Sequence, residues 1–129
     1  MVELTARQRA ELHGRLHEEY EIRVAEVRAE LHQHGLGQHA ELTGQVFDAG
    51  DASVADLLAD LEIDLAQRHT ERLRELERAL TAVRDGRYGS CLDCGTMIPY
   101  QRLEALPTAL RCAACQAQHE RADPHHGTL

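Results

Sequence analysis

The chain has 129 residues, a mass of 14.4 kDa and a formal net charge of −8, from 14 basic and 22 acidic side chains. This acidity argues against a protein that wraps non-specifically around DNA, because such binding needs a cationic surface. Phe, Trp and Tyr make up only 3% of the chain, and the abundance of Ala, Leu, Arg and Glu is typical of long helices or coiled coils. There is no apolar run of about eighteen residues and no signal-peptide core at the start, so we expect a cytoplasmic protein without membrane contact.

The first segment, from about residue 5 to 34, has helical periodicity. Thr5 can cap its start. Apolar side chains follow one another at steps of three or four residues, at Leu12, Leu16, Tyr20, Val24, Val27 and Leu31. The sequence therefore predicts a long helix with one apolar stripe. Four glycines between residues 35 and 50 predict that the helix ends there and the chain turns.

A second periodic segment spans residues 53 to 84. Its apolar stripe consists of Val54, Leu58, Leu61, Leu65, Leu73, Leu76, Leu80 and Val83, with His69 in register. We expect one helix, roughly 48 Å long, that packs against the first as an antiparallel hairpin. The fold class predicted is mainly α: a two-helix coiled-coil hairpin over residues 1–86, with an acidic tip at about 45–53, then a small zinc-ribbon domain and a short helix. The charged residues off the stripe, Arg68, Glu71, Arg72, Glu75 and Arg78, are expected to form a solvated face.

Four cysteines dominate the remaining segment, 87–129. Two C-x2-C pairs, separated by seventeen residues, comprise Cys91, Cys94, Cys112 and Cys115. This spacing is typical of a four-thiolate zinc site, which is structural because it leaves no open coordination position, and we favour it over a redox pair. Gly95 allows the left-handed turn of such a knuckle. We expect Tyr88, Ile98 and Leu103 to pack around the metal, a helix from about residue 112, and a flexible tail from residue 123.

Two acidic residues, Asp48 and Asp51, lie between the predicted helices. They have two interpretations, which can hold together. Asp51 or Ser53 can cap the second helix. Alternatively, the carboxylates sit at the end of a thin rigid arm, which can enter a narrow channel and meet a cation or a basic group there.

The histidines and the remaining polar residues give no sign of a catalytic site. His13 and His17 are one helical turn apart, and His125 and His126 adjoin in the tail, but we interpret these pairs as surface histidines. No catalytic triad, phosphate loop or pair of carboxylates stands out, so we do not expect an enzyme.

Two stretches resemble a known family. GRYGSCLDCGTMIPYQRLEALPTALRCAACQ, residues 86–116, resembles the C4 zinc-finger signature of the DksA/TraR family. DAGDAS, residues 48–53, is similar to that family's Asp-x-x-Asp-x-Ala tip motif, with Ser53 in place of the Ala. The resemblance covers roughly residues 35 to 118. It implies a transcription regulator that binds RNA polymerase directly, with the coiled coil in the secondary channel and Asp48 and Asp51 near the catalytic Mg²⁺. It also implies that the four cysteines hold one Zn²⁺.

The sequence departs from the family in places. The N-terminal region is shorter than in the DksA type. Glu75, Leu106 and Gln116 stand where the family has cations that contact ppGpp, the effector of the stringent response, so we expect weak or absent ppGpp binding. Arg68, Arg72 and Arg102 remain near that region and are candidate contacts to polymerase or ppGpp.

We expect a monomer with no sequence-specific DNA binding. The alternatives are a zinc-dependent nucleic-acid-binding protein, a redox-sensing adaptor, and a transcript-cleavage enzyme with a similar arm. The first has little support, because residues 87–118 contain only three arginines and few aromatic side chains on which bases could stack.

Overall fold

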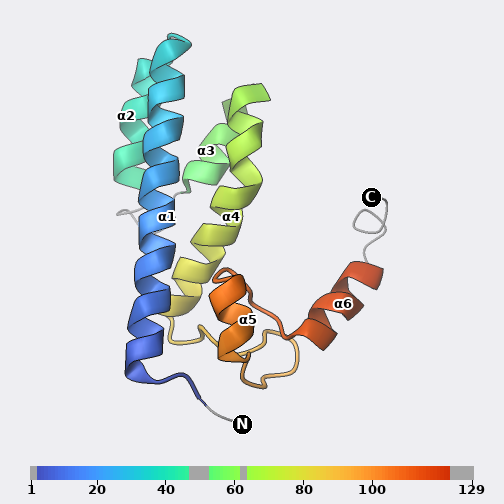
Figure 1. Ribbon diagram of the computed structural model, residues 1–129. Helices are drawn as coiled ribbons and strands as arrows, with labels where there is room; N and C mark the ends of the chain where they lie inside the picture. Colours follow the sequence, from blue (N-terminus) through green and yellow to red (C-terminus); the bar gives the residue numbers. More distant parts are fainter. Residues whose placement is uncertain (1–2, 47–52, 62–63, 123–129) are drawn as a thin grey trace.

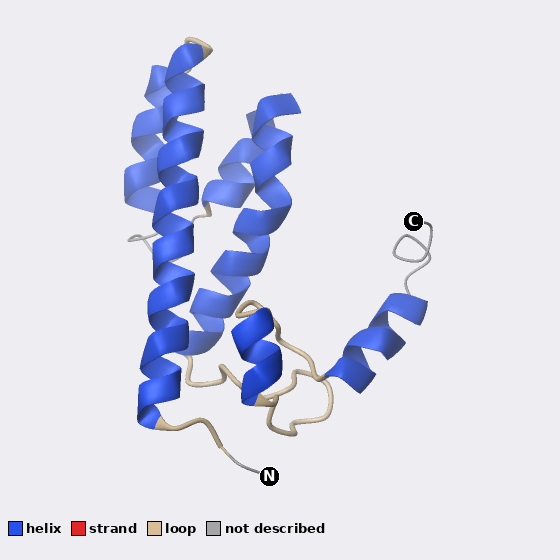
Figure 2. Ribbon diagram, viewed as in Figure 1, coloured by secondary structure: helices blue, strands red, loops and turns tan. Residues whose placement is uncertain are grey.

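The computed structural model describes residues 3–46, 53–61 and 64–122 (Figure 1). Within these ranges the chain forms helices connected by loops and no β-strand, apart from an isolated bridge between Ser90 and Met97 (Figure 2). The helices are α1 (Ala6–Gln33), α2 (Gly37–Val46), α3 (Val54–Leu61), α4 (Asp64–Arg84), α5 (Tyr100–Ala105) and α6 (Ala113–Ala122). The expectation of a mainly helical fold is confirmed.

The long helices α1 and α4 lie side by side and form what we call the shaft (Figure 1). α1 begins with a capping box, in which Thr5 Oγ1 accepts from the Gln8 N–H and Gln8 Oε1 from the Thr5 N–H, each at 3.0 Å. Every member of its predicted stripe is buried. On α4, Leu73 and Leu76 are fully buried against it, so the stripes of the two helices meet as expected.

The segment between the shaft helices differs from the prediction. The glycine-rich interval contains a helix, α2, which packs on α1. The prediction of one helix over residues 53–84 is wrong, because α3 ends at Leu61 and α4 begins at Asp64, and α3 packs back on α4. The physical reason is the length of α1, which ends at Gln33. A single second helix over residues 53–84 would extend past that end and leave the apolar stripe of its first part without a partner on α1. Folding back buries this stripe, now on α3, against the shaft.

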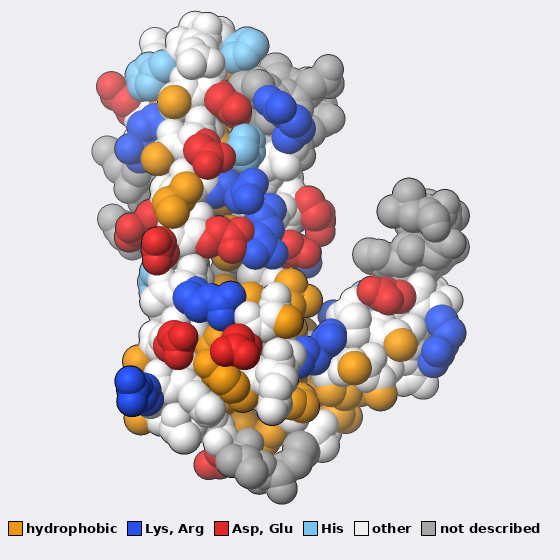
Figure 3. All heavy atoms as spheres, in the orientation of Figure 1, with side chains coloured by type: hydrophobic (Ala, Val, Ile, Leu, Met, Phe, Trp, Pro, Cys, Tyr) orange, Lys and Arg blue, Asp and Glu red, His pale blue; other side chains and the backbone are white. Residues whose placement is uncertain are grey.

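The C-terminal region packs on the base of the shaft. One apolar cluster joins Leu12 and Leu16 of α1 to Tyr88, Ile98 and Leu103. These last three side chains are buried in the core that the finger shares with α1. On the face shown in Figure 3, charged side chains cover much of the shaft and hydrophobic ones gather near α5 at its base. The helix α5 was not predicted.

The last helix, α6, projects away from the shaft (Figure 1) and none of its residues is buried. No helix in the described part of the chain is both long and apolar enough to cross a membrane. The domain boundary near residue 86 stays a prediction, and the predicted tail from residue 123 lies outside the described ranges.

Candidate metal centre and the adjoining cleft

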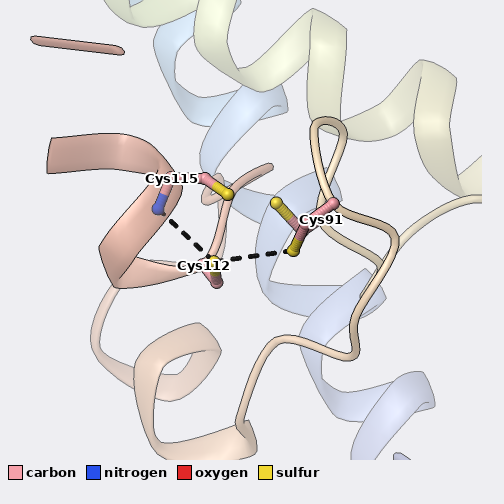
Figure 4. Close-up of side chains that lie close together, drawn as sticks. Cys91, Cys112 and Cys115 are labelled. Carbon is pink, nitrogen blue, oxygen red and sulfur yellow. Dashed lines mark hydrogen bonds between the residues drawn. The ribbon is translucent and has the colours of Figure 1, made fainter. Parts of the chain in front are cut away.

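The four cysteines come together from two short segments. Cys91 and Cys94 lie on a turn closed by the Gly95 N–H, which donates to the Cys91 carbonyl at 3.0 Å, and Gly95 has a φ of +76°. Cys112 precedes α6 and Cys115 lies in its first turn, where the Cys115 N–H donates to Cys112 Sγ at 3.5 Å (Figure 4). The predicted left-handed glycine and the predicted helix from about residue 112 are therefore confirmed.

The geometry fits a tetrahedral metal. All four sulfur atoms lie within 4.8 Å of one another, and those of Cys94 and Cys112 are 3.9 Å apart. Zinc–sulfur bonds of about 2.3 Å in a tetrahedron put the sulfurs roughly 3.8 Å apart. Four thiolates leave no position for water or substrate, so a metal here stabilises the fold and carries out no reaction.

The local hydrogen bonds favour thiolates in the first pair. Burial raises the pKa of Cys91, but backbone N–H groups, led by that of Cys94, outweigh this effect and lower it to about 6. The hydroxyl of Thr96, 2.7 Å from Cys94 Sγ, lowers the pKa of Cys94. In the second pair, hydrogen bonding with Cys112 raises the pKa of Cys115. Since a metal binds thiolates, metal binding here would require Cys115 to lose its proton.

The three candidate arginines lie in different surroundings. Arg72 is not part of a solvated face: its side chain is 26% exposed and forms a two-pronged ion pair with Glu19 of α1, with Nη2 at 2.7 Å from Oε1. Arg68 is 66% exposed, with Nη2 3.7 Å from Glu30. Arg102 donates from Nε to the Arg111 carbonyl at 3.0 Å. Arg72 also donates to Thr108, in the loop after α5, at 3.3 Å. Arg68 has no such contact in the described part of the chain, and its acidic neighbour Glu30 belongs to α1.

A cleft of about 580 Å³ lies between α4, the loop after α5, and α6. Glu75, Leu106 and Gln116, the positions where the family has cations, all line it, together with Arg102. Further charged side chains of both signs line it, namely Glu71, Arg78, Arg111 and Glu120, together with His119. The three altered positions thus share one site, whose lining is of mixed charge.

Of the predicted tip, Asp48 and Asp51 lie outside the described residues, and only Ser53 can be placed. It caps α3, because its Oγ accepts from the Asp56 N–H at 3.1 Å, which confirms the capping prediction for this residue. It lies beside the middle of the shaft, where its Oγ also donates to Glu77 of α4.

Glu77 is the centre of a polar cluster that the sequence analysis missed, which we call the Glu77 clasp. Its Oε2 accepts from the Tyr20 hydroxyl at 2.8 Å and from the Val54 N–H at 3.0 Å, and its Oε1 from Ser53. Burial, followed by the Glu77 hydrogen bond, raises the pKa of Tyr20. The tyrosine in an otherwise aliphatic stripe was the available signal, because a buried hydroxyl needs a partner.

Two histidines also differ from a simple surface placement. His13 is half-buried, with its ring edge-on to that of Tyr88 at 5.3 Å between centroids, so the surface interpretation is wrong for this residue. His69 is buried in the shaft, with Nε2 at 3.0 Å from Glu30 Oε2 and Nδ1 at 3.4 Å from Arg23 Nη1. His125 and His126 lie outside the described ranges.

Comparison with known proteins places the cysteine region in a family. Residues 86–121 match the prokaryotic dksA/traR C4-type zinc finger. The chain is 34% identical over 79 residues to the RNA polymerase-binding transcription factor DksA of Caulobacter vibrioides, covering 61% of this chain and 56% of that protein. It is 38% identical over 85 residues to general stress protein 16O of Bacillus subtilis, covering 62% and 52%. It is 46% identical over 59 residues to the uncharacterized protein YteA of the same organism, covering 46% and 24%.

The chain thus spans little more than half the length of these relatives, and only 24% of one of them. The matched segment contains the whole cysteine site, whose four sulfurs fit one structural Zn²⁺. The predicted zinc finger is therefore confirmed. Residues 86–121 are therefore a zinc finger of the dksA/traR C4 type, and the chain resembles a DksA protein over 61% of its length.

Proposed function

We propose that this protein is a cytoplasmic, monomeric transcription regulator that binds RNA polymerase directly and is not itself an enzyme. The observation that carries the proposal is the DksA/TraR zinc finger packed on the base of an antiparallel helical shaft. A relative of the chain is named for binding RNA polymerase. The net charge of −8 suits a protein partner better than a nucleic acid.

The mechanism we propose is insertion of the helical arm into the secondary channel of polymerase. Two helices side by side are roughly 20 Å across, which is thin enough for a passage that excludes a globular domain. In this structure α2 and α3 also lie along the shaft, so the proposed insertion requires them to leave it. Asp48 and Asp51 would then act as fixed negative charges near the catalytic Mg²⁺, and would change the lifetime of the open promoter complex. The exposed Arg68 offers a cation on the outside of the arm.

Nucleic-acid binding by the finger is the weaker alternative, because three of its arginines are already engaged. Arg87 lies 3.2 Å from Asp85, and Arg111 lies 2.9 Å from Asp93. Arg102 donates to a backbone carbonyl. Phosphate binding would have to compete with these contacts. For a redox adaptor, the closeness of all four sulfurs favours a single metal over two independent thiol pairs.

The test combines binding and transcription with purified components. The zinc-loaded protein is expected to co-elute with core RNA polymerase and to shorten or lengthen the lifetime of open complexes at a promoter that forms unstable ones. Failure to co-elute at micromolar concentrations would overturn the proposal, and retention on duplex DNA in the same assay would support the nucleic-acid alternative. A cleavage assay on a backtracked complex then separates a regulator, which leaves the transcript intact, from a cleavage enzyme.

A further inference from the structure

We propose that α2 and α3 are folded back along the shaft in a resting form, and that they can instead extend it as a longer hairpin, in which α2 continues α1 through Gly35 and α3 continues α4. The conformational change itself does not depend on the proposed function, but its role in polymerase binding does. It is supported by the pairing of the shaft helices, by the glycines of the bend and by the Glu77 clasp.

The pairing of α1 with α4 already has the register of a longer hairpin. Glu30 lies 3.0 Å from His69, and Tyr20 lies 2.8 Å from Glu77, so partners are placed symmetrically about residue 49. Continuing this register beyond the end of α1 pairs α2 with α3, for example Ala40 with Leu58. Both side chains are fully buried in the folded-back form. The same apolar faces can therefore be buried either on the shaft or against each other.

The bend between α1 and α2 depends on glycine. Gly35 has a φ of +75°, and the Leu36 N–H donates to the Leu31 carbonyl at 2.8 Å, as in a Schellman motif. A Cβ at Gly37 would lie 3.1 Å from His32 Nδ1, a tight contact that favours glycine unless the exposed His32 ring moves by a few tenths of an ångström. A continuous helix through residues 35 and 37 would not need glycine at either position, and glycine lowers the stability of such a helix. These residues thus favour the bend without excluding the straight form.

The Glu77 clasp fastens α3 to the shaft only in the folded-back form. Its three donors come from two elements: the Tyr20 hydroxyl from α1, and the Ser53 hydroxyl and Val54 N–H from the start of α3. Arg74 adds an ion pair to Asp56 at 2.8 Å. In an extended hairpin the start of α3 lies beyond the end of α1, and Glu77 keeps Tyr20 alone. The clasp therefore acts as a latch.

Extension changes the reach of the arm. The 28 residues of α1 span roughly 42 Å, and a helix continued through α2 to residue 46 spans roughly 60 Å. A partner with a deep, narrow channel contacts more of the extended form and so selects it, whereas the folded-back form is shorter and thicker. The latch would then limit insertion until polymerase is engaged.

The test measures one distance in the full-length, zinc-loaded protein. Spin labels on non-natural amino acids replace Glu11 and Glu41, which are both exposed, so that the cysteines remain free for zinc. The folded-back form places these positions roughly 28 Å apart, and a continuous helix places them roughly 45 Å apart. The free protein is expected to give mainly the shorter distance, and core polymerase is expected to shift it to the longer one.

The decisive variant is Gly35→Ala, with Gly14→Ala as matched control. Both add a methyl group to a glycine with open space around it, but only Gly35 has a positive φ. Gly35→Ala should raise the ratio of long to short distances about tenfold, and Gly14→Ala should leave it unchanged. An unchanged distribution in Gly35→Ala, an equal shift in Gly14→Ala, or a free wild-type protein already at the longer distance would each overturn the proposal. Should the protein fail to bind polymerase, the proposed function fails, while the contrast between these variants still decides the bend.

Discussion

Removing the metal is expected to unfold the finger and leave the helices of the shaft. Cys94→Ser deletes one of four thiolates, and a segment of about forty residues has too small a core to fold without its metal. The affected helices, α5 and α6, have 6 and 10 residues, whereas α1, α2, α3 and α4 have 28, 10, 8 and 21. Loss of the finger should therefore lower the helical signal in circular dichroism by about a fifth.

The assay follows ellipticity at 222 nm during chelation of the wild-type protein, with zinc release measured by a chromophoric chelator. Leu92→Ser is the matched control, because it introduces serine at an exposed neighbour of the first knuckle that is not a ligand. Elemental analysis should give one zinc per wild-type chain and well under one for Cys94→Ser. A chelated protein with unchanged ellipticity and an intact finger would refute the reasoning, and so would collapse of the whole helical signal, which would mean that the shaft itself depends on the metal.

Three further predictions concern charged residues. The double variant Asp48→Asn, Asp51→Asn should keep the melting temperature and polymerase binding of the wild type but lose most of its transcriptional effect. Full activity of this variant on a sensitive promoter would contradict the prediction and would mean that the two residues serve only as helix caps. In transcription assays, ppGpp should increase the effect of the protein by less than about twofold, because Glu75 and two uncharged residues stand in the cleft where the family has cations. A large increase with ppGpp that is abolished by replacing an arginine of the cleft would contradict this prediction. Arg72→Ala should lower the free energy of unfolding in urea by about 1 kcal/mol at pH 7, since the Glu19 pair is partly exposed. The hydrogen bond from Arg72 lowers the pKa of Glu19, so this stabilisation should be present at neutral pH and be lost as pH falls below the ordinary range of a glutamate, a dependence that the variant should lack.

The parts of the fold that could be predicted from the sequence are those with a strong local signal. The α1 stripe combines strict spacing with a cap at Thr5, and all its members are buried. The metal site follows from cysteine spacing, which constrains geometry independently of the rest of the chain. Both predictions depend on residues close together in sequence.

The folded-back segment could not be predicted in the same way. The stripe through Val54 and Leu58 has the same period whether it continues into α4 or packs against it, so periodicity alone does not distinguish the two. Glycines near Gly37 suggested a loop, but packing on α1 outweighs their low helix propensity. The Glu77 clasp joins residues far apart in sequence. Tyr20 in the α1 stripe indicates that a polar partner is needed, but not which residue supplies it.

The attachment of α6 has a thermodynamic consequence. No residue of this helix is buried, and it begins at the second cysteine pair, so the metal fixes the direction in which it leaves the finger. Gln116 and Glu120 of α6 form one wall of the cleft, whose opposite wall belongs to α4. Any molecule that contacts both walls therefore binds the zinc-loaded protein more tightly than the metal-free one. By reciprocity, that molecule must raise the affinity for zinc by the same factor, which couples occupancy of the cleft to the availability of the metal.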